Sequence, residues 1–139
     1  EERSAEAVRL IALRDRLIAG ITAAVPEAYL IGHAFRRLPG HVCVGLAGLE
    51  GESITLMLAL DEAGFAVSTG SACSAHKASE PSYVLQAMGF DAFRARGALR
   101  LTLGRASTAE EVDSFLNTLP RVVARLRPIT TRAARAVGV

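Results

Sequence analysis

The sequence predicts an α+β domain in which helices cover a small, largely antiparallel sheet. Three observations lead to this prediction: apolar residues recur at helical spacing near both ends of the chain, strand-like alternation occurs between them, and no stretch has the composition of a linker. The chain has 139 residues, of which 50% are hydrophobic and 22% are charged. A chain of this size can bury one core, so we expect residues 1–139 to form a single domain.

The first element expected is an amphipathic helix from Ala5 to about Ala24. Apolar residues recur along one side and charged residues fill much of the opposite side, in the two sets Val8, Ile11, Leu17, Ile18, Ile21 and Arg9, Arg14, Asp15, Arg16. Pro26 should end this helix. A connecting stretch follows and reaches a turn at Pro39-Gly40.

A strand, a helix and a second short strand are expected next. The first strand covers residues 41–47. Along it the larger apolar residues Val42, Val44 and Leu46 alternate with Cys43 and Gly45, which is the period of a strand. The helix covers residues 53–63, with acidic residues near its amino end and Gly64 placed to cap it. Residues 65–68 form the second strand, which leads directly into residues 69–73.

The remaining elements are a loop, two helices and a strand. Residues 74–79 contain no apolar side chain larger than Ala, so we expect a mobile loop. A third helix should start at residues 80–82, with Pro81 near its first turn, and end at Gly89. Apolar and polar residues alternate over residues 98–103, as in a strand with one face toward a core. The side chains expected to face the core are Leu99, Leu101 and Leu103, and those expected to face away are Arg100 and Thr102. Two overlapping capping boxes begin a last helix, from about residue 109 to 126.

Composition argues against several classes of protein. No apolar run approaches the roughly 18 to 20 residues of a membrane span, and the first residues are acidic, unlike a signal peptide. We therefore expect a soluble, cytoplasmic protein. The net charge is only +2, so direct nucleic-acid binding is not expected. A basic cluster in the tail fits a solvated helix face and consists of Arg121, Arg125, Arg127, Arg132 and Arg135.

The two cysteines, Cys43 and Cys73, have different settings. A chain this rich in apolar residues does not need a disulfide, so we expect both thiols to be reduced. Cys43 lies between two valines, which favours a buried or incidental thiol. Cys73 follows a small-residue turn and precedes a segment with nothing to bury, so its sulfur should be exposed. The nearby His76 and Lys77 would lower the pKa of the Cys73 thiol below its reference value of roughly 8.5.

Arg100 is the second candidate site residue. It lies on a strand whose other face is formed by leucines, and its guanidinium fork suits a carboxylate, which it would bind through two parallel hydrogen bonds. A surface ion pair fits the spacing equally well. An intrinsic zinc site is not expected, because the candidate ligands lack the short paired spacing of structural zinc sites; these ligands are Cys43, Cys73, His33, His41 and His76.

Five segments of the chain carry a resemblance through both their residues and their order. They are Glu50-Gly51-Glu52-Ser53, Ser68-Thr69-Gly70-Ser71-Ala72-Cys73-Ser74, Glu80-Pro81-Ser82-Tyr83-Val84-Leu85, Leu99-Arg100-Leu101-Thr102-Leu103-Gly104-Arg105 and Thr108-Ala109-Glu110-Glu111-Val112-Asp113. Together they resemble the carboxy-terminal small domain of cysteine desulfurases, within the class V aminotransferase superfamily of fold-type I pyridoxal phosphate enzymes. The resemblance extends over nearly the whole chain.

The resemblance implies an enzyme that removes sulfur from L-cysteine and leaves alanine and an enzyme persulfide. By motif position, Cys73 is the nucleophile that attacks the substrate sulfur, and Arg100 binds the substrate carboxylate. The persulfide would serve iron–sulfur cluster assembly or another sulfur-transfer pathway through an acceptor or scaffold protein, with Cys73 as a transient iron–sulfur ligand. Members of the family are usually homodimers built mainly through a large domain.

The sequence departs from the family pattern at three points. The loop from Cys73 to Pro81 is one residue longer than the commonest version and carries His76-Lys77 where small residues are usual. Cys43 stands where the family often has Asn. The cofactor-binding half of the family is missing, so the helix of residues 1–25 would connect to an absent large domain.

The missing half bears on pyridoxal 5'-phosphate, which needs a lysine, a phosphate cradle and an acidic partner for its ring nitrogen. Of sixteen basic residues, Lys77 is the sole lysine, and its place in the expected mobile loop is a poor one for holding a cofactor rigidly. We therefore expect this chain alone neither to bind the cofactor tightly nor to turn over cysteine.

Two other functions remain compatible with the sequence. One is a non-enzymatic persulfide carrier or interaction module, in which Cys73 accepts sulfur from a separate donor. The other is a related enzyme of the same fold that acts on selenocysteine. The roles of Arg105, Cys43, His76 and Lys77, the acceptor protein and the oligomeric state are not determined by these residues.

Overall fold

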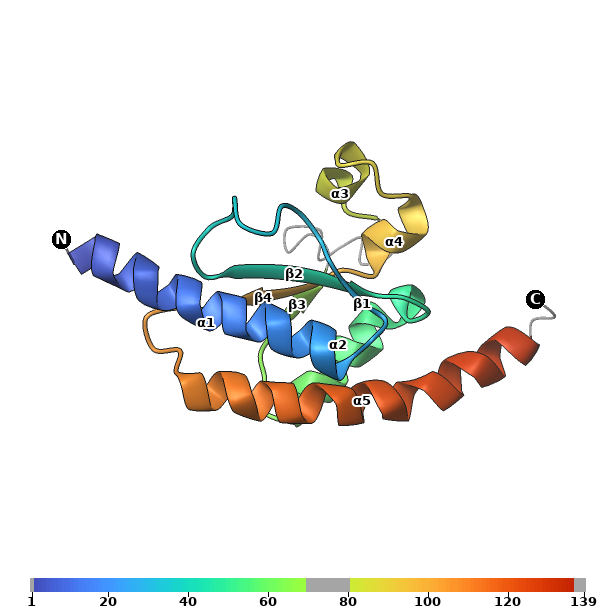
Figure 1. Ribbon diagram of the computed structural model, residues 1–139. Helices are drawn as coiled ribbons and strands as arrows, with labels where there is room; N and C mark the ends of the chain where they lie inside the picture. The colour runs from blue at the N-terminus through green and yellow to red at the C-terminus, as the bar shows by residue number, and fades with distance from the viewer. Residues whose placement is uncertain (1, 70–80, 137–139) are drawn as a thin grey trace.

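The computed structural model describes residues 2–69 and 81–136, and the side chains of residues 3–69 and 81–127. The described chain contains a four-stranded sheet between two unequal helical layers (Figure 1). Its elements in chain order are α1 (Glu2–Ala24), β1 (Ala28–Leu30), β2 (His41–Leu46), the 3-10 helix η1 (Glu50–Glu52), α2 (Ser53–Glu62), β3 (Ser68–Thr69), α3 (Tyr83–Ala87), α4 (Ala92–Arg96), β4 (Leu99–Thr102) and α5 (Ala109–Ala136).

The strands lie in the order β1-β2-β4-β3, and each described pair is antiparallel. This confirms the expected α+β class and the antiparallel sheet. Cys43 of β2 and Ser68 of β3 both lie opposite Arg100, on either side of β4. Tyr29 of β1 lies opposite Gly45 of β2. The register therefore fixes which side chains share a face, because successive residues of a strand point to opposite faces.

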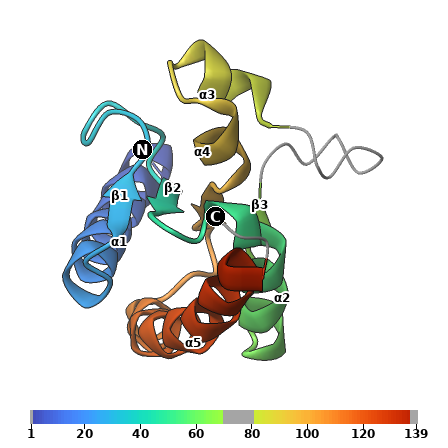
Figure 2. The same cartoon turned by 90° about the vertical axis from the view of Figure 1, so that its right-hand side faces the viewer.

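Helices α1, α2 and α5 cover one face of the sheet, and this face holds the main core (Figure 2). The side chains of β2 and β4 on this face are at most 6% exposed and are Val42, Val44, Leu46, Leu99 and Leu101. The alternation expected for both strands is confirmed. At roughly 25 cal/mol per Å² of apolar surface removed from water, this layer is the main source of stability.

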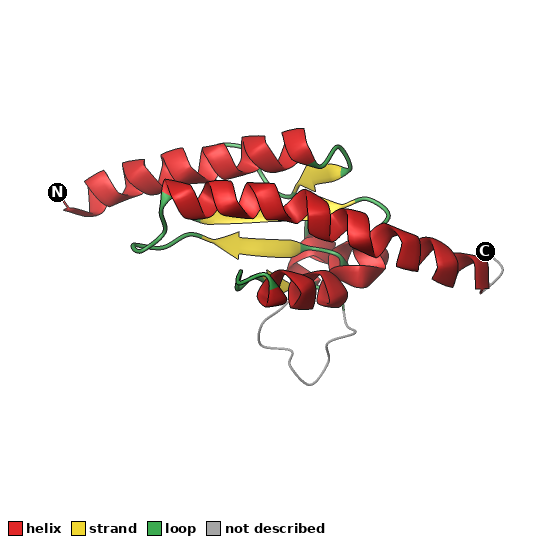
Figure 3. Cartoon of the chain, turned by 90° about the horizontal axis from the view of Figure 1, so that it is seen from below, coloured by secondary structure: helices red, strands yellow, loops and turns green. Residues whose placement is uncertain are grey.

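Helices α1 and α5 run side by side in the same direction across that face (Figure 3). The expected apolar side of α1 was only partly right. Leu17 and Ile21 are buried, but Val8 and Ile11 are 68% and 37% exposed, because the first turns of α1 extend beyond the sheet (Figure 1). Arg14, expected on the solvent side, is 3% exposed, and its Nη1 donates a hydrogen bond to the carbonyl of Leu38 at 3.4 Å.

Local signals set several helix ends. The backbone N–H of Glu111 donates to Thr108 Oγ1 at 3.2 Å, and the carboxylate of Glu111 accepts from the N–H of Thr108 at 3.0 Å. Of the two overlapping capping boxes, this reciprocal pair is the one that starts α5. Gly64 and Gly89 both have φ of +91°, which confirms them as the residues that end α2 and α3.

Two elements were not predicted, and two boundaries differ clearly from expectation. The elements β1 and α4 were missed because segments of three and five residues are too short to show a period. The third helix starts at Tyr83 rather than at 80–82, with Ser82 as its N-cap. Helix α5 continues to Ala136, well past residue 126.

The second expected strand, residues 65–68, was misplaced. Pairing with β4 begins only at Ser68. The ring of Phe65 instead packs edge-on against the ring of Phe115 of α5, with the two ring centres 5.3 Å apart, so the residues before Ser68 turn toward the helices. The expected loop of residues 74–79 lies outside the described residues. No helix in the described part of the chain is long and apolar enough to cross a membrane.

Candidate functional site

The candidate site lies on the face of the sheet opposite the main core. Four residues that are neighbours across the strands form one row on this face, in the order Ile31, Cys43, Arg100 and Ser68. The backbone N–H of Ile31 donates to the carbonyl of Cys43 at 2.9 Å, which extends the row past the end of β1. We call this surface the open face, defined by His41, Cys43, Arg100 and Ser68.

Arg100 is the cation at the centre of the open face. Its side chain is half-buried, and among the described residues it makes no hydrogen bond and no ion pair. Strand β4 is paired on both sides, so the backbone of Arg100 is held while its guanidinium is available. A half-buried guanidinium without a counter-ion is suited to bind an anion, and its planar fork suits a carboxylate.

Cys43 is the direct neighbour of Arg100 on β2 and carries a free thiol. The expectation of a buried thiol among valines was partly right: the thiol is half-buried, but it points away from the valine face. Burial raises the pKa of the Cys43 thiol, and the positive charges of Arg100 and Arg37 oppose this effect to a smaller extent. The thiol is therefore protonated near neutral pH, so Cys43 does not compensate the charge of Arg100.

Two further groups act on the surroundings of Arg100, namely the imidazole of His41 and the positively charged Arg37. His41 lies two residues before Cys43 on the same face, and its pKa is lowered by burial first and then by Arg37 and Arg100. Arg37 donates from Nε to the carbonyl of His33 at 2.8 Å and from Nη2 to the carbonyl of Ile31 at 3.0 Å. The sequence did not single out Arg37, because an arginine in an irregular connecting stretch has no periodic signal.

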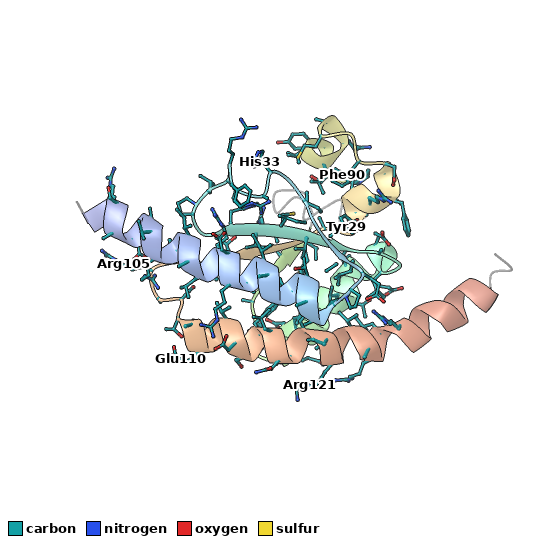
Figure 4. The ribbon with its side chains drawn as sticks, viewed as in Figure 1. Tyr29, His33, Phe90, Arg105, Glu110 and Arg121 are labelled. Atoms are coloured by element: carbon teal, nitrogen blue, oxygen red, sulfur yellow. The ribbon has the colours of Figure 1, made fainter. Side chains whose placement is uncertain are left out.

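Helices α3 and α4 cover the other end of this face with a second, smaller apolar cluster. Its buried members are Ile31, Leu85, Ala95 and Ala98, and its half-buried members are Tyr29, Cys43 and Phe90. Figure 4 shows Tyr29 and Phe90 on the side of the sheet that carries α3 and α4. The guanidinium carbon of Arg94 lies 5.8 Å from the centre of the Tyr29 ring, a cation–π distance. One boundary of the open face is thus apolar.

The segment after β4 is fixed to α1. Arg9 donates to the carbonyls of Ser107, Gly104 and Arg105 at 2.6, 3.2 and 3.0 Å, and its charge is balanced by Glu6. Figure 4 shows Arg105 at this end of the molecule, beside the first turns of α1. These bonds hold the exit of β4, and so help to fix the strand that carries Arg100.

The other predicted site residues belong to the part of the chain that the structure does not describe. Cys73, His76 and Lys77 lie in residues 70–80, outside the described residues, and Cys73 as an iron–sulfur ligand lies there as well. Arg100 is therefore the predicted site residue whose surroundings are visible. Within residues 2–69 and 81–136, no three side chains of His, Cys, Asp or Glu gather in a way that would hold a metal ion.

The described residues do not fit pyridoxal phosphate. They contain no lysine, since Lys77 is the only lysine of the chain, and a lysine is the group to which this cofactor is attached. A cavity of about 310 Å³ lies on the other side of the sheet, between the start of α5 and residues 64–67, and is lined mostly by apolar side chains. Neither Arg100 nor Cys43 lines this cavity.

Comparison with protein families gives a match over most of the chain. Residues 5–115 match the family described as aminotransferase class-V. The chain is 48% identical over 130 residues to "Cysteine desulfurase IscS 1" of Archaeoglobus fulgidus, which covers 94% of this chain and 33% of that protein. It is 46% identical over 137 residues to "IscS-like cysteine desulfurase" of Mycobacterium tuberculosis, covering 98% of this chain and 33% of that protein.

Solved structures agree with these matches. A protein described as "NIFS-LIKE PROTEIN" superposes with a TM-score of 0.74 and 31% identity, covering 91% of this chain and 30% of that one. A NifS-like protein from Rickettsia africae superposes with a TM-score of 0.73 at 17% identity, which supports the fold alone. The chain spans about a third of the length of the curated relatives that it matches.

Proposed function

The chain belongs to the aminotransferase class-V family, and from this membership we propose that it is the carboxy-terminal small domain of a cysteine desulfurase. In this proposal the full-length protein removes sulfur from L-cysteine, with L-alanine as the other product. Residues 1–139 supply the residue that carries the sulfur and a residue that binds the substrate, and residues 1–25 connect to a large domain.

One observation carries the proposal, namely that the guanidinium of Arg100 on the open face has no counter-ion among the described residues. An α-amino acid substrate must be oriented by its carboxylate so that its sulfur faces the nucleophile. Arg100 is half-buried, has no described hydrogen-bond partner and lies on a strand that is paired on both sides. These properties support a rigid anchor for a carboxylate. A hydrogen bond to a charged group contributes roughly 1.5–3 kcal/mol.

We propose Cys73 as the nucleophile that holds the sulfur as a persulfide. Ser68 and Thr69 of β3 pair with Arg100 and Leu99, and Cys73 follows Thr69 by four residues. Four residues of fully extended chain span at most roughly 14 Å. This short separation along the chain supports Cys73 as the partner of Arg100 in the proposal.

In this proposal the cofactor of the reaction is bound by the large domain and not by residues 1–139. Cysteine desulfurases are pyridoxal phosphate enzymes, and the cofactor withdraws electrons from the substrate carbon. Because the described residues contain no lysine, we assign the cofactor to the large domain. The contributions of this chain are then to orient the substrate through Arg100 and to carry sulfur on Cys73 to an acceptor or scaffold protein for iron–sulfur cluster assembly or other sulfur transfer.

The mass of the protein after incubation with a small-molecule persulfide donor tests this proposal. We expect the wild-type chain to gain one sulfur atom at Cys73 within minutes, and the Cys73→Ala variant to gain little, because burial keeps the Cys43 thiol protonated. Equal gain by the wild type and Cys73→Ala would contradict the proposal. Full-length protein separates the enzyme from a non-enzymatic carrier, since only the enzyme releases alanine from cysteine.

The same full-length protein distinguishes a selenocysteine-specific relative. If Cys73→Ser stops the release of alanine from cysteine but not from selenocysteine, the protein is a selenocysteine lyase. If both reactions require Cys73, it is a desulfurase.

A further inference from the structure

We propose that His41 is a second contact for the carboxylate held by Arg100, and that Arg37 is the residue that positions His41. This inference rests on the proposed role of Arg100 as a carboxylate anchor. It adds a specificity-determining side chain on β2 and a positioning residue in the segment before β2, neither of which follows from the sequence motifs.

The first argument is the sheet register. Cys43 lies opposite Arg100, and His41 lies opposite Thr102. His41, Cys43 and Arg100 thus share one face, with His41 diagonal to Arg100, and diagonal neighbours of this kind are roughly 7–8 Å apart at the backbone. Two long side chains at this separation can converge on one small anion between them. Cys43 lies beside both, two residues from His41 on β2 and opposite Arg100 on β4, and its thiol is short and neutral.

The second argument is the way in which Arg37 holds the start of β2. Its guanidinium donates to three backbone carbonyls, those of His33, Ile31 and His41, at 2.8, 3.0 and 3.4 Å. The backbone N–H of His41 donates to the carbonyl of Leu38 at 3.2 Å. His41 is therefore fixed through both of its backbone polar groups. A planar fork can bridge three carbonyls in this way, whereas an ammonium group has no fixed fork.

The third argument is the charge around His41. The groups that act on it are Arg37 from the connecting segment and Arg100 from β4, and both lower its pKa. Cys43 on the same strand is uncharged near neutral pH. Behind Arg37 lies the buried Arg14 of α1, whose partner Asp15 is the nearby carboxylate that also acts on Arg37. Positive groups therefore outnumber negative ones at this site, which favours an incoming anion.

A consequence for pH follows from these contacts. The pKa of His41 is lowered, so its imidazole is neutral near pH 7 and donates one hydrogen bond to the carboxylate. A bound carboxylate adds a negative charge beside the ring and must raise that pKa. By linkage, the affinity for the carboxylate then rises as the pH falls through the pKa of His41. The factor of this rise equals the factor by which the bound carboxylate strengthens proton binding to His41.

Nuclear magnetic resonance on the chain tests the inference with sodium formate as the probe, because formate stays ionised where histidine titrates. The chain has only three histidines, so their ring signals can be followed one by one. At constant ionic strength with sodium chloride as the reference, we expect formate to raise the pKa of His41 by about half a unit or more, and to leave His33 unchanged. Arg100→Gln should remove the effect.

The side-chain N–H signal of Arg100 separates this inference from the proposed function. If formate shifts the Arg100 signal but not the pKa of His41, the inference is wrong and the carboxylate role of Arg100 stands. If formate shifts neither, the carboxylate anchor itself is wrong, and the inference falls with it.

Arg37 has its own pair of variants. Arg37→Gln removes a positive charge, so the pKa of His41 in the free chain should rise. Arg37→Lys keeps the charge but cannot bridge three carbonyls, so the pKa of free His41 should stay close to wild type while the effect of formate falls at least twofold. If Arg37→Lys keeps the full formate effect, Arg37 does not position His41. In His41→Gln, an amide N–H replaces that of the ring, so formate should still shift the Arg100 signal, but with no increase in affinity toward low pH.

Discussion

The two faces of the sheet are made from the same strands but have opposite chemistry. On β2 and β4, the side chains that face α1, α2 and α5 are Val42, Val44, Leu46, Leu99 and Leu101, and each is at most 6% exposed. Three of the alternate residues, His41, Cys43 and Arg100, are half-buried and carry an imidazole, a thiol and a guanidinium. One face therefore provides stability, and the other is the face on which we propose that the substrate binds.

The largest expected effect compares adjacent residues of β4. Leu99→Ala should lower the free energy of unfolding by about 2–5 kcal/mol, because it leaves a cavity in the core. Arg100→Gln should change it by no more than about 0.5 kcal/mol, since the guanidinium has no described partner to lose. Urea unfolding followed by circular dichroism measures both. A loss of more than about 2 kcal/mol in Arg100→Gln would mean that Arg100 is a structural residue.

A second comparison sharpens the description of the open face near β1. A Cβ added at Gly45 would lie 2.1 Å from the Cζ atom of Tyr29, so the ring packs directly on the glycine. We expect Gly45→Ala to cost about 1–3 kcal/mol of unfolding free energy. Gly51→Ala is the matched control, because its nearest neighbour would be Phe93 at 3.8 Å. Thermal unfolding of the two variants decides, and equal stability would show that the Tyr29 ring moves away freely.

A third and smaller effect concerns thiol reactivity on the open face. In a Cys73→Ser background, Cys43 is the single thiol, and its pKa is raised by burial. Alkylation by iodoacetamide at pH 8 should be at least tenfold slower than in urea, and should accelerate as pH rises toward the raised pKa. Mass spectrometry gives both rates. If the folded and unfolded chains react at the same rate, the Cys43 thiol is not shielded.

The smallest effect is the pH dependence of stability due to His41. Its folded-state pKa is lowered from 6.5, so the folded state resists its protonation while the unfolded state accepts the proton. The contribution of neutral His41 is therefore present above pH 6.5 and is lost as pH falls below that value. Compared with His41→Gln, the wild type should lose stability more steeply from pH 7 to pH 5.5. Identical slopes would place His41 in an environment no different from solvent.

The sequence predicted those parts of the fold that rest on periodicity or on a local rule. The alternation of Leu99, Arg100 and Leu101 predicted both the core face and the opposite orientation of Arg100, and Thr108 with Glu111 marked the start of α5. It did not predict Arg14, whose burial depends on a loop that folds over α1 from 24 residues away. Contacts of that kind arise only when the chain is assembled.

The candidate site divides in the same way. Arg100 was predicted as a site residue because its strand alternates and because its segment resembles a family motif. The roles that we propose for His41 and Arg37 were not predicted, because they rest on the pairing of β2 with β4 and on three hydrogen bonds to backbone carbonyls. No single-sequence rule encodes strand register over 60 residues, since it depends on how both faces of the sheet are covered.

If Arg100 binds the substrate as we propose, its position on an interior strand would make the sheet sensitive to the length of the substrate. Because β4 is paired on both sides, the backbone of Arg100 cannot retreat to accommodate a longer molecule. If a carboxylate is fixed there, each additional methylene moves the sulfur of the substrate farther from that fixed origin. Discrimination between cysteine and homocysteine would then come from the stiffness of the sheet, with no pocket wall needed to exclude the longer amino acid.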